Sequence, residues 1–466
     1  MELLIKGGRV VTDSEVFEAD VGVDGGRIVA IAKDLREEAD RVIDAKGKYV
    51  LPGAIDAHTH MEFPFMGTTS ADDFYHGTLA AACGGTTTII DFALQTEGQT
   101  LFQTIEQWHR KADPKAAVDY GFHMIITDLN ETTFGEIKKV IEYGIPSFKC
   151  FMTYKGLRLD DGSIYSVMQE AAKYGGLVGL HCENNDIISF LVNKFIGEGK
   201  TAPEYHAKAK PPIVEEEAAG RAILFARSSG CNSYIVHMST RSAREAVKAA
   251  EAAGAPFFSE TCPHYLMFTD DVYTRPDGHK YVMSPPIKFK EDREALWRGL
   301  AEGDIKTVAS DHCCFNFEQK MMGKDDFTKI PNGVPGTEVI IPILHSEGVA
   351  RGILPITRLV QVTSYNPARI FGLYPQKGTI AVGSDADLVI LDPDKRIKLD
   401  MECLHSNIDY SIYEDYTATG YPEMTISRGE VVAEQGDFVG KKGRGQFLKR
   451  KANPPGAPPP WIAVPQ

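Results

Sequence analysis

The sequence predicts an α/β chain: a (β/α)8 TIM barrel over residues 51–375, with a second, small β-sandwich domain built from both chain ends. Two observations carry this prediction. Apolar runs suited to buried strands recur through the middle of the chain with helical segments between them, and short alternating segments with turn signals occupy both ends. A doubly wound sheet is the competing fold, but no Gly-x-Gly-x-x-Gly opens a helix and eight consecutive units favour closure.

The apolar runs give the barrel strands in chain order. They are residues 54–60, 86–92, 120–126, 147–153, 177–182, 234–238, 257–261 and 307–311. In a TIM barrel the active site lies at the C-terminal ends of the strands. The last residues of these runs are therefore where chemistry is expected.

The two chain ends have the texture of short antiparallel strands. Within residues 1–50, alternating apolar segments are separated by Gly-Gly and Asp-Gly turn signals, and the same texture returns in residues 376–440. Either sheet alone would be marginal, so we expect the two parts to pair into one β domain. Residues 441–466 contain a proline pair and a proline triplet that fit neither helix nor central strand. They predict an extended tail, either draped over a neighbouring surface or disordered.

Composition limits the function classes. Of 466 residues, 43% are hydrophobic and 24% charged, and the formal net charge is −14, which argues against nucleic-acid or anionic-membrane partners. No run approaches about 18 uninterrupted apolar residues, and the N-terminal apolar run is too short for a signal peptide, so we expect a cytoplasmic protein. The eight cysteines are scattered without Cys-x-x-Cys spacing, which favours reduced core thiols.

The first strand run ends in a pair of histidines. His58 and His60 are two residues apart, and strand side chains alternate with a period of two, so both imidazoles point to the same side. Such a pair can hold one metal ion. An isolated His-x-His is more often one core residue and one surface residue, so the remaining ligands decide the interpretation.

The fourth run contains a lysine in an apolar strand. Burying the ammonium of Lys149 is costly unless it is paired or its pKa falls. One explanation is an ion pair with a carboxylate such as Glu183. The other is that the neutral amine has reacted with carbon dioxide to give a carbamate, an anion able to bridge two metal ions.

Three further runs end in ligand-type residues. His181 ends the fifth run, His237 the sixth and Asp311 the eighth. Each alone would be unremarkable. Together with His58, His60 and Lys149 they place four histidines, a lysine and an aspartate at five strand ends of one predicted barrel, which predicts a metal centre.

These motifs resemble the hydantoinase/dihydropyrimidinase family of the amidohydrolase superfamily, and the likeness runs over nearly the whole chain. The segments that carry it are Asp56-Ala57-His58-Thr59-His60, Ser147-Phe148-Lys149, His181-Cys182-Glu183-Asn184, Val236-His237, Ser284-Pro285-Pro286, Asp311-His312-Cys313, Ile330-Pro331-Asn332-Gly333, Lys377-Gly378-Thr379-Ile380 and Gly383-Ser384-Asp385-Ala386-Asp387-Leu388. The resemblance implies a binuclear zinc site. One ion would be held by His58, His60 and Asp311 and the other by His181 and His237, with N6-carboxylated Lys149 and a hydroxide bridging both.

The activity implied is hydrolysis of the cyclic amide of hydantoins or 5,6-dihydropyrimidines to N-carbamoyl amino acids. Asp311 is the expected proton carrier. By resemblance, Tyr154 donates a hydrogen bond to the oxyanion, and Ser284 and Asn332 hold the ring, largely through backbone groups. Apolar side chains on and after two ligand-bearing strands would receive a substituent on the ring carbon; they are Phe63, Phe65, Phe151 and Leu157.

Several alternatives stay open from the sequence. Allantoinase is a near alternative, and dihydroorotase is disfavoured because Arg158 is the one cation in these loops that could meet a substrate carboxylate. The family also has non-catalytic scaffold relatives that have lost the ligands, all of which this chain keeps. The same ligands would accept Mn2+, Co2+ or Ni2+ as well as Zn2+. The resemblance implies a homotetramer.

Overall fold

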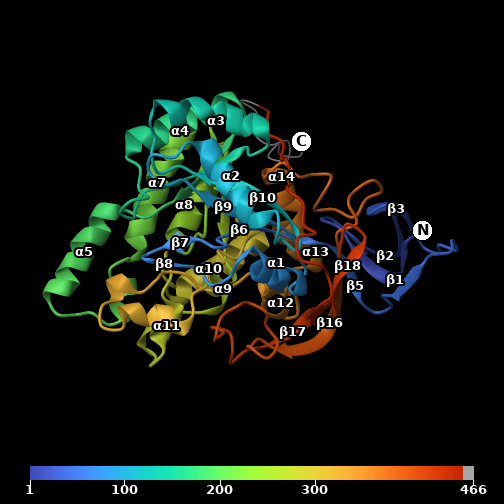
Figure 1. Ribbon diagram of the computed structural model, residues 1–466. Coiled ribbons are helices and arrows are strands. Elements are labelled where there is room, and N and C mark those ends of the chain that lie inside the picture. The colour runs from blue at the N-terminus through green and yellow to red at the C-terminus, as the bar shows by residue number, and fades with distance from the viewer. Residues whose placement is uncertain (455–466) are drawn as a thin grey trace.

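Eight parallel strands form the inner wall of the larger part of the structure, a computed structural model that describes residues 1–454 (Figure 1). They are β6 (Ala54–Thr59), β9 (Thr86–Leu94), β10 (Asp119–Ile125), β11 (Ser147–Phe151), β12 (Leu177–His181), β13 (Asn232–Ile235), β14 (Phe257–Thr261) and β15 (Thr307–Val308). Each pairs with its neighbour in chain order. The first and last are joined beyond β15, where Thr59 bridges His312 and the His60 N–H donates to the His312 carbonyl at 2.8 Å. The predicted barrel is confirmed.

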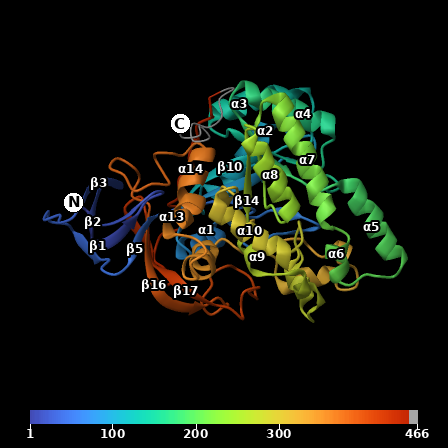
Figure 2. The same ribbon diagram turned by 180° about the vertical axis from the view of Figure 1, so that it is seen from behind.

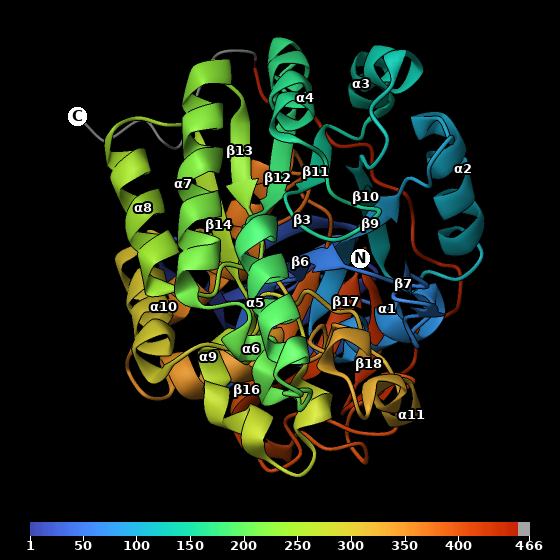
Figure 3. The same cartoon turned by 90° about the vertical axis from the view of Figure 1, so that its left-hand side faces the viewer.

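Helices follow the strands and cover the outside of the barrel, as Figure 3 shows for α2, α3, α4, α7, α8 and α10. The helices are α1 (Phe74–Cys83), α2 (Leu101–Ala112), α3 (Glu131–Tyr143), α4 (Asp161–Lys173), α5 (Asn185–Gly197), α6 (Glu204–Lys208), α7 (Pro212–Ser229), α8 (Arg241–Ala252), α9 (Pro263–Met267), α10 (Lys290–Glu302), α11 (Phe317–Lys320), α12 (Ile340–Ile343), α13 (Ile356–Val360) and α14 (Asn366–Ile370). Their ends follow from local sequence. Thr100 and Gln103 form a capping box at the start of α2, and Gly144 ends α3 with a left-handed φ of 113°.

A second sheet of nine strands lies beside the barrel and takes strands from both chain ends. Its strands are β1 (Leu3–Val11), β2 (Val16–Asp24), β3 (Arg27–Ala32), β4 (Arg41–Asp44), β5 (Tyr49–Pro52), β16 (Leu388–Lys398), β17 (Thr417–Ser427), β18 (Glu430–Glu434) and β19 (Asp437–Phe438). The two ends meet where β5 pairs antiparallel with β16. In Figure 2, α13 and α14 lie between the barrel and this sheet.

The described part of the C-terminal segment crosses the end of the barrel where the strands begin. The Tyr120 N–H donates to the Gln446 carbonyl at 3.0 Å, and the Leu448 N–H donates to the Tyr120 carbonyl at 2.7 Å. The buried Arg450 guanidinium donates to Ser147 Oγ at 2.7 Å. This segment covers the face opposite the strand ends that carry the predicted ligands. The rest of the predicted proline-rich tail, residues 455–466, lies outside the described residues.

No helix within residues 1–454 combines the length and the apolar character that crossing a bilayer requires.

Candidate metal centre and substrate pocket

The predicted ligands meet in one cavity at the C-terminal ends of the barrel strands. The cavity has a volume of about 450 Å³. Its wall includes every predicted metal ligand and every predicted substrate residue: His58, His60, Phe63, Phe65, Lys149, Phe151, Tyr154, Leu157, His181, His237, Ser284, Asp311 and Asn332. The structure therefore brings together residues that lie up to 274 positions apart in the sequence, from His58 to Asn332.

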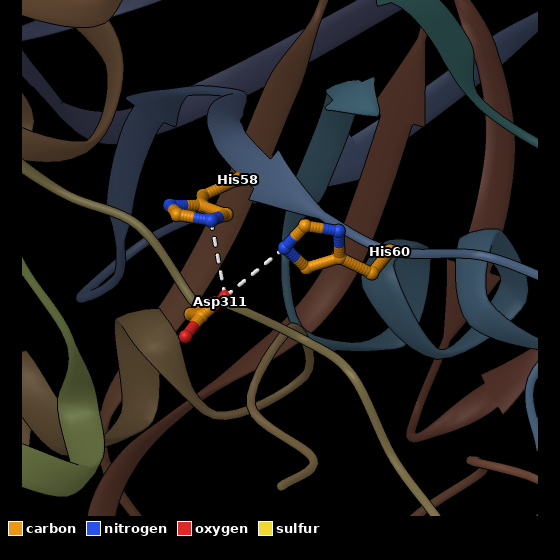
Figure 4. A group of neighbouring side chains, drawn as sticks. All are labelled: His58, His60 and Asp311. Atoms are coloured by element: carbon orange, nitrogen blue, oxygen red, sulfur yellow. Dashed lines mark ion pairs between the residues drawn. The ribbon is translucent and has the colours of Figure 1, made fainter. Parts of the chain in front are cut away.

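The first ligand group is His58, His60 and Asp311 (Figure 4). One carboxylate oxygen of Asp311 lies 3.0 Å from His58 Nε2 and 3.3 Å from His60 Nε2. A carboxylate and two imidazoles converging in this way form a donor set that divalent transition metals favour.

The second group is formed by two further imidazoles and a lysine. His181 Nδ1 and His237 Nε2 lie 2.9 Å apart. The ring centroids of His58 and His237 are 5.4 Å apart, so the two groups adjoin each other. Lys149, on β11, lines the same cavity.

Lys149 is buried without a compensating charge. Its side chain is 1% exposed, and its ammonium lies over the rings of Phe92 and Phe151, at 5.0 and 5.1 Å from their centroids. The suggested partner Glu183 is engaged elsewhere, with Lys210 Nζ and His181 Nε2, both at 2.8 Å. Burial lowers the pKa of Lys149 to about 8, against the opposing charge of Asp311. The ion-pair explanation for this lysine therefore lacks its carboxylate.

Three functional residues have left-handed backbone conformations. Their φ angles are 79° at Tyr154, 42° at His237 and 50° at Asp311. Such conformations are strained for residues with a side chain and persist where the surroundings hold them. They also mark a correction to the predicted strands: β13 ends at Ile235 and β15 at Val308, so His237 and Asp311 lie on the loops that follow. Period-two alternation cannot predict where the backbone leaves the strand.

Burial and neighbouring charges shift the pKa values of the four imidazoles. Burial lowers the pKa values of His60 and His181 to about 4 and that of His237 well below its ordinary value, so these rings are neutral at pH 7. Burial also lowers the pKa of His58, but the carboxylates of Glu260 and Asp311 outweigh it and raise the pKa to about 9. The environment of His58 thus favours a positive charge, which a proton or a metal ion can supply.

Glu260 is the functional residue that the sequence reasoning missed. Its carboxylate contacts His58 Nδ1 directly, accepts the His237 N–H at 2.9 Å and accepts the Tyr234 hydroxyl at 3.0 Å. A carboxylate on the far nitrogen of a ligating histidine fixes its tautomer and orientation. The signal in the sequence is a glutamate inside the apolar run 257–261.

The residues present fit a metal site. His58 Nε2, the ring nitrogen that faces the Asp311 carboxylate, is buried and has no hydrogen-bond partner in the described part of the chain. Buried polar atoms are normally satisfied. Burial raises the pKa of Asp311, but His58 outweighs it and holds that pKa well below its usual range. An ionised carboxylate beside a neutral His60, and beside a His58 whose surroundings favour a positive charge, suits the binding of a divalent cation.

Three predicted substrate residues are linked on the opposite wall. The amide of Asn332 donates to Tyr154 Oη at 3.1 Å and to Ser284 Oγ at 3.0 Å. Lys210, which the sequence reasoning did not single out, donates to Ser284 Oγ at 2.6 Å and, through Glu183, joins this wall to His181. Hydrogen-bonding groups thus face the ligands across the cavity.

Aromatic and aliphatic side chains close the rest of the wall. The ring centroids of Phe63 and Phe65 are 6.0 Å apart, and those of Phe65 and Tyr154 are 5.3 Å apart. Phe151 and Leu157 line the same cavity. A cavity with converging polar groups on one side and an apolar rim is typical of small-molecule sites.

Comparison with known proteins finds relatives over nearly the whole chain. The sequence profile described as Amidohydrolase family matches residues 49–432. The D-hydantoinase of Geobacillus stearothermophilus is 46% identical over 455 residues, covering 97% of both chains. The dihydropyrimidinase of Rattus norvegicus is 42% identical over 460 residues, 96% of this chain and 89% of that protein.

Solved structures are similar over the same extent. The crystal structure of dihydropyrimidinase from Brevibacillus agri NCHU1002 superposes with a TM-score of 0.96 at 44% sequence identity, covering 97% of this chain and 99% of that one. The likeness therefore includes the barrel and the second sheet together.

Proposed function

Because this chain belongs to the hydantoinase/dihydropyrimidinase family of the amidohydrolase superfamily, we propose that a binuclear metal centre in the cavity carries its reaction. The protein is a cyclic amide hydrolase. It opens hydantoin or 5,6-dihydropyrimidine rings with water and gives N-carbamoyl amino acids. One observation carries the proposal: six ligand-type side chains from five strand ends line the same cavity as three hydrogen-bonded substrate residues.

The histidine and aspartate cluster is a divalent metal site, and we propose that it takes two ions, Zn2+ by preference. His58, His60 and Asp311 would hold one ion, and His181 and His237 the other. Lys149 would serve both after carboxylation: its neutral amine nitrogen bonds to the carbon of CO2 and releases one proton, which leaves a carbamate anion. The lowered pKa of Lys149 and its lack of a carboxylate partner support this step.

When bound, such ions lower the pKa of water and polarise the amide carbonyl. Asp311, ionised by its low pKa, orients the attacking water and accepts its proton. As the ring C–N bond breaks, the same carboxyl gives that proton to the leaving nitrogen. The Tyr154 hydroxyl donates to the oxygen that gains negative charge.

Ser284 and Asn332 hold the ring, and the apolar wall receives its substituent. The side chains of Phe63, Phe65 and Leu157 lie on the rim beside Tyr154. We propose that bulky aromatic or aliphatic 5-substituted hydantoins are accepted, since their burial against these rings is favourable.

The test compares dihydrouracil with D- and L-5-benzylhydantoin on one preparation, with metal content measured alongside. Turnover with about two metal ions per chain is expected. Metal-free protein that opens no ring would favour a non-catalytic scaffold. Two bound ions without turnover of any of these rings would reject the substrate assignment and direct the search to allantoin.

We also propose a cytoplasmic homotetramer. All eight cysteines are free thiols, which suits a reducing compartment. α5 lies at the far left of Figure 1 and exposes Phe190 and Ile196, at 67% and 39% exposure. Apolar side chains gathered on a protruding helix are typical of subunit contacts. Light scattering on the purified chain tests the tetramer, and Phe190→Lys is expected to weaken it.

A further inference from the structure

Lys320 is a buried lysine that neither the metal centre nor the proton transfer uses. It ends α11, and its side chain is completely buried. Its ammonium donates to three backbone carbonyls: Val282 at 2.8 Å, Pro331 at 2.7 Å and Gly333 at 2.6 Å. All three N–H bonds of the ammonium are therefore satisfied by main-chain oxygens from two separate segments.

Those two segments are the ones that carry the substrate residues. Val282 lies two positions before Ser284, and Pro331 and Gly333 flank Asn332 on either side. The segments also touch directly, because the Gly333 N–H donates to the Val282 carbonyl at 3.0 Å and the Asn332 amide donates to Ser284 Oγ. The Lys320 ammonium thus connects the two segments through hydrogen bonds to the backbone of both.

The carbonyl contacts also orient backbone N–H groups. The peptide between Pro331 and Asn332 is trans, so its N–H points opposite to the carbonyl that Lys320 holds. The ammonium therefore fixes the direction of the Asn332 N–H. A shift of about 1 Å in such a group can cost a hundredfold in rate.

We propose that Lys320 is a positioning residue that sets the spacing and peptide orientation of the 282–284 and 331–333 segments, through which Ser284 and Asn332 hold the cyclic amide. This inference rests on the proposed function. Lys320 touches neither substrate nor metal ligands in this role. It acts on the ring through the backbone of the two segments.

The choice of a charged side chain supports a functional role. Among the described residues, the titratable groups that act on Lys320 are the thiols of Cys313 and Cys314, and no carboxylate pairs with it. An ammonium without a counter-charge is an expensive way to join two loops. Three carbonyls directed at one point require a donor of three hydrogen bonds, which a lysine ammonium alone among side chains supplies from a single atom.

The test is Lys320→Met, which keeps the length of the side chain and removes its donors. The matched control is Lys377→Met, another buried lysine, which lies at the junction of the barrel and the second sheet. For Lys320→Met, KM for dihydrouracil and D-5-benzylhydantoin is expected to rise about tenfold with kcat and metal content close to those of the parent, because interactions with the ring are lost from both ground and transition states. In Lys377→Met, KM is expected to stay unchanged.

Hydrogen exchange provides a readout that does not depend on turnover. Amides in residues 282–284 and 331–334 are expected to exchange faster in Lys320→Met than in the parent, with no such change in Lys377→Met. If the parent opens none of the rings, the proposed function fails and exchange alone decides the role of Lys320.

Lys320→Gln keeps the proposal testable if the methionine variant does not fold. Its neutral amide offers two N–H donors in place of three. KM and the amide exchange rates of Lys320→Gln are therefore expected to lie between those of the parent and those expected for Lys320→Met. A folded, metal-loaded variant of either kind with parental KM and parental exchange would overturn the proposal.

Discussion

Two lysines in this chain are equally buried and have opposite surroundings. Lys149, in the barrel mouth, and Lys377, at the junction with the second sheet, are each 1% exposed. Lys377 Nζ lies 2.7 Å from Asp119, 2.7 Å from Asp387 and 3.1 Å from Asp385. Lys149 has no carboxylate at ion-pair distance within residues 1–454.

The pKa values diverge accordingly. Burial lowers both, but at Lys377 the charges of Asp387 and Asp119 outweigh burial and raise the pKa, whereas at Lys149 burial prevails and the pKa falls to about 8. A compensated lysine stays charged and holds two parts of the fold together. Lys149, which lacks such carboxylates, is the lysine that we propose reacts with CO2; Lys320 also lacks a carboxylate, but three backbone carbonyls hold its ammonium. The difference shows that the surroundings, rather than residue type or depth, separate a structural lysine from a reactive one.

The largest effect is expected from Lys149→Ala. Without the carbamate the metal ions are lost, together with several kcal/mol of transition-state stabilisation, so kcat/KM is expected to fall about 10³-fold or more. Ring opening and metal content measure this, and circular dichroism is expected to show a retained fold. Full activity of Lys149→Ala with bound metal would contradict a functional role for Lys149.

Lys377→Met tests the structural role of Lys377. Removing Lys377 leaves the buried Asp387 without a cation, whereas Asp119 keeps Arg428 and Asp385 keeps Arg27. About 3–5 kcal/mol of unfolding free energy is expected to be lost, with kcat unchanged for the folded protein. Because the folded pKa of Lys377 is raised above its ordinary 10.5, the stabilisation is fully present below that pH. The stability difference from the parent should therefore be constant between pH 7 and 9 and shrink only above about pH 10.5, as denaturant unfolding would reveal.

Glu260→Gln tests how strongly a carboxylate beside His58 contributes to metal binding in the cavity. The substitution removes the charge that holds His58 while keeping a polar side chain, and metal affinity is expected to weaken about 10–100-fold. Chelator competition measures it. Asp20→Asn is the control, since Asp20 is also a buried carboxylate but accepts the backbone N–H groups of Gly7 and Leu35 in the second sheet. Equal losses in both variants would contradict a specific role for Glu260.

The smallest effect is expected at the outer rim. Phe65→Ala and Leu157→Ala remove apolar contacts of partly exposed side chains to a ring substituent but touch no metal ligand, so the ratio of benzyl- to methylhydantoin turnover should fall about tenfold. Competition assays with both substrates measure the ratio. An unchanged ratio would mean that the substituent lies elsewhere.

The clustering of the candidate ligands could be predicted from the sequence because each lies at or just beyond an apolar strand run. His58, His60, Lys149, His181, His237 and Asp311 all line one cavity, as the barrel interpretation requires. The fold follows for the same reason: eight apolar runs with helical segments between them have few ways to close. The pairing of the two chain ends, which occurs between β5 and β16, was also predictable, since a small sheet from either end alone would be marginally stable.

What could not be predicted is which individual side chains contact each other across long sequence separations. Glu260 contacts His58 across 202 positions, and Lys320 reaches Val282 across 38. No local pattern specifies such contacts. The wrong proposal of Glu183 as the partner of Lys149 has the same origin, because Lys210 takes that carboxylate from a loop that shows no strand periodicity.

The central claim is that Lys149 is carboxylated because its charge is uncompensated. The most direct measurement is carbon-13 NMR of protein reconstituted with metal and 13C-labelled bicarbonate. The account predicts one labelled carbamate carbon per chain in the parent and in Lys377→Met, and none in Lys149→Ala. An active, metal-loaded parent that retains no labelled carbon, or label that persists in Lys149→Ala, would contradict it.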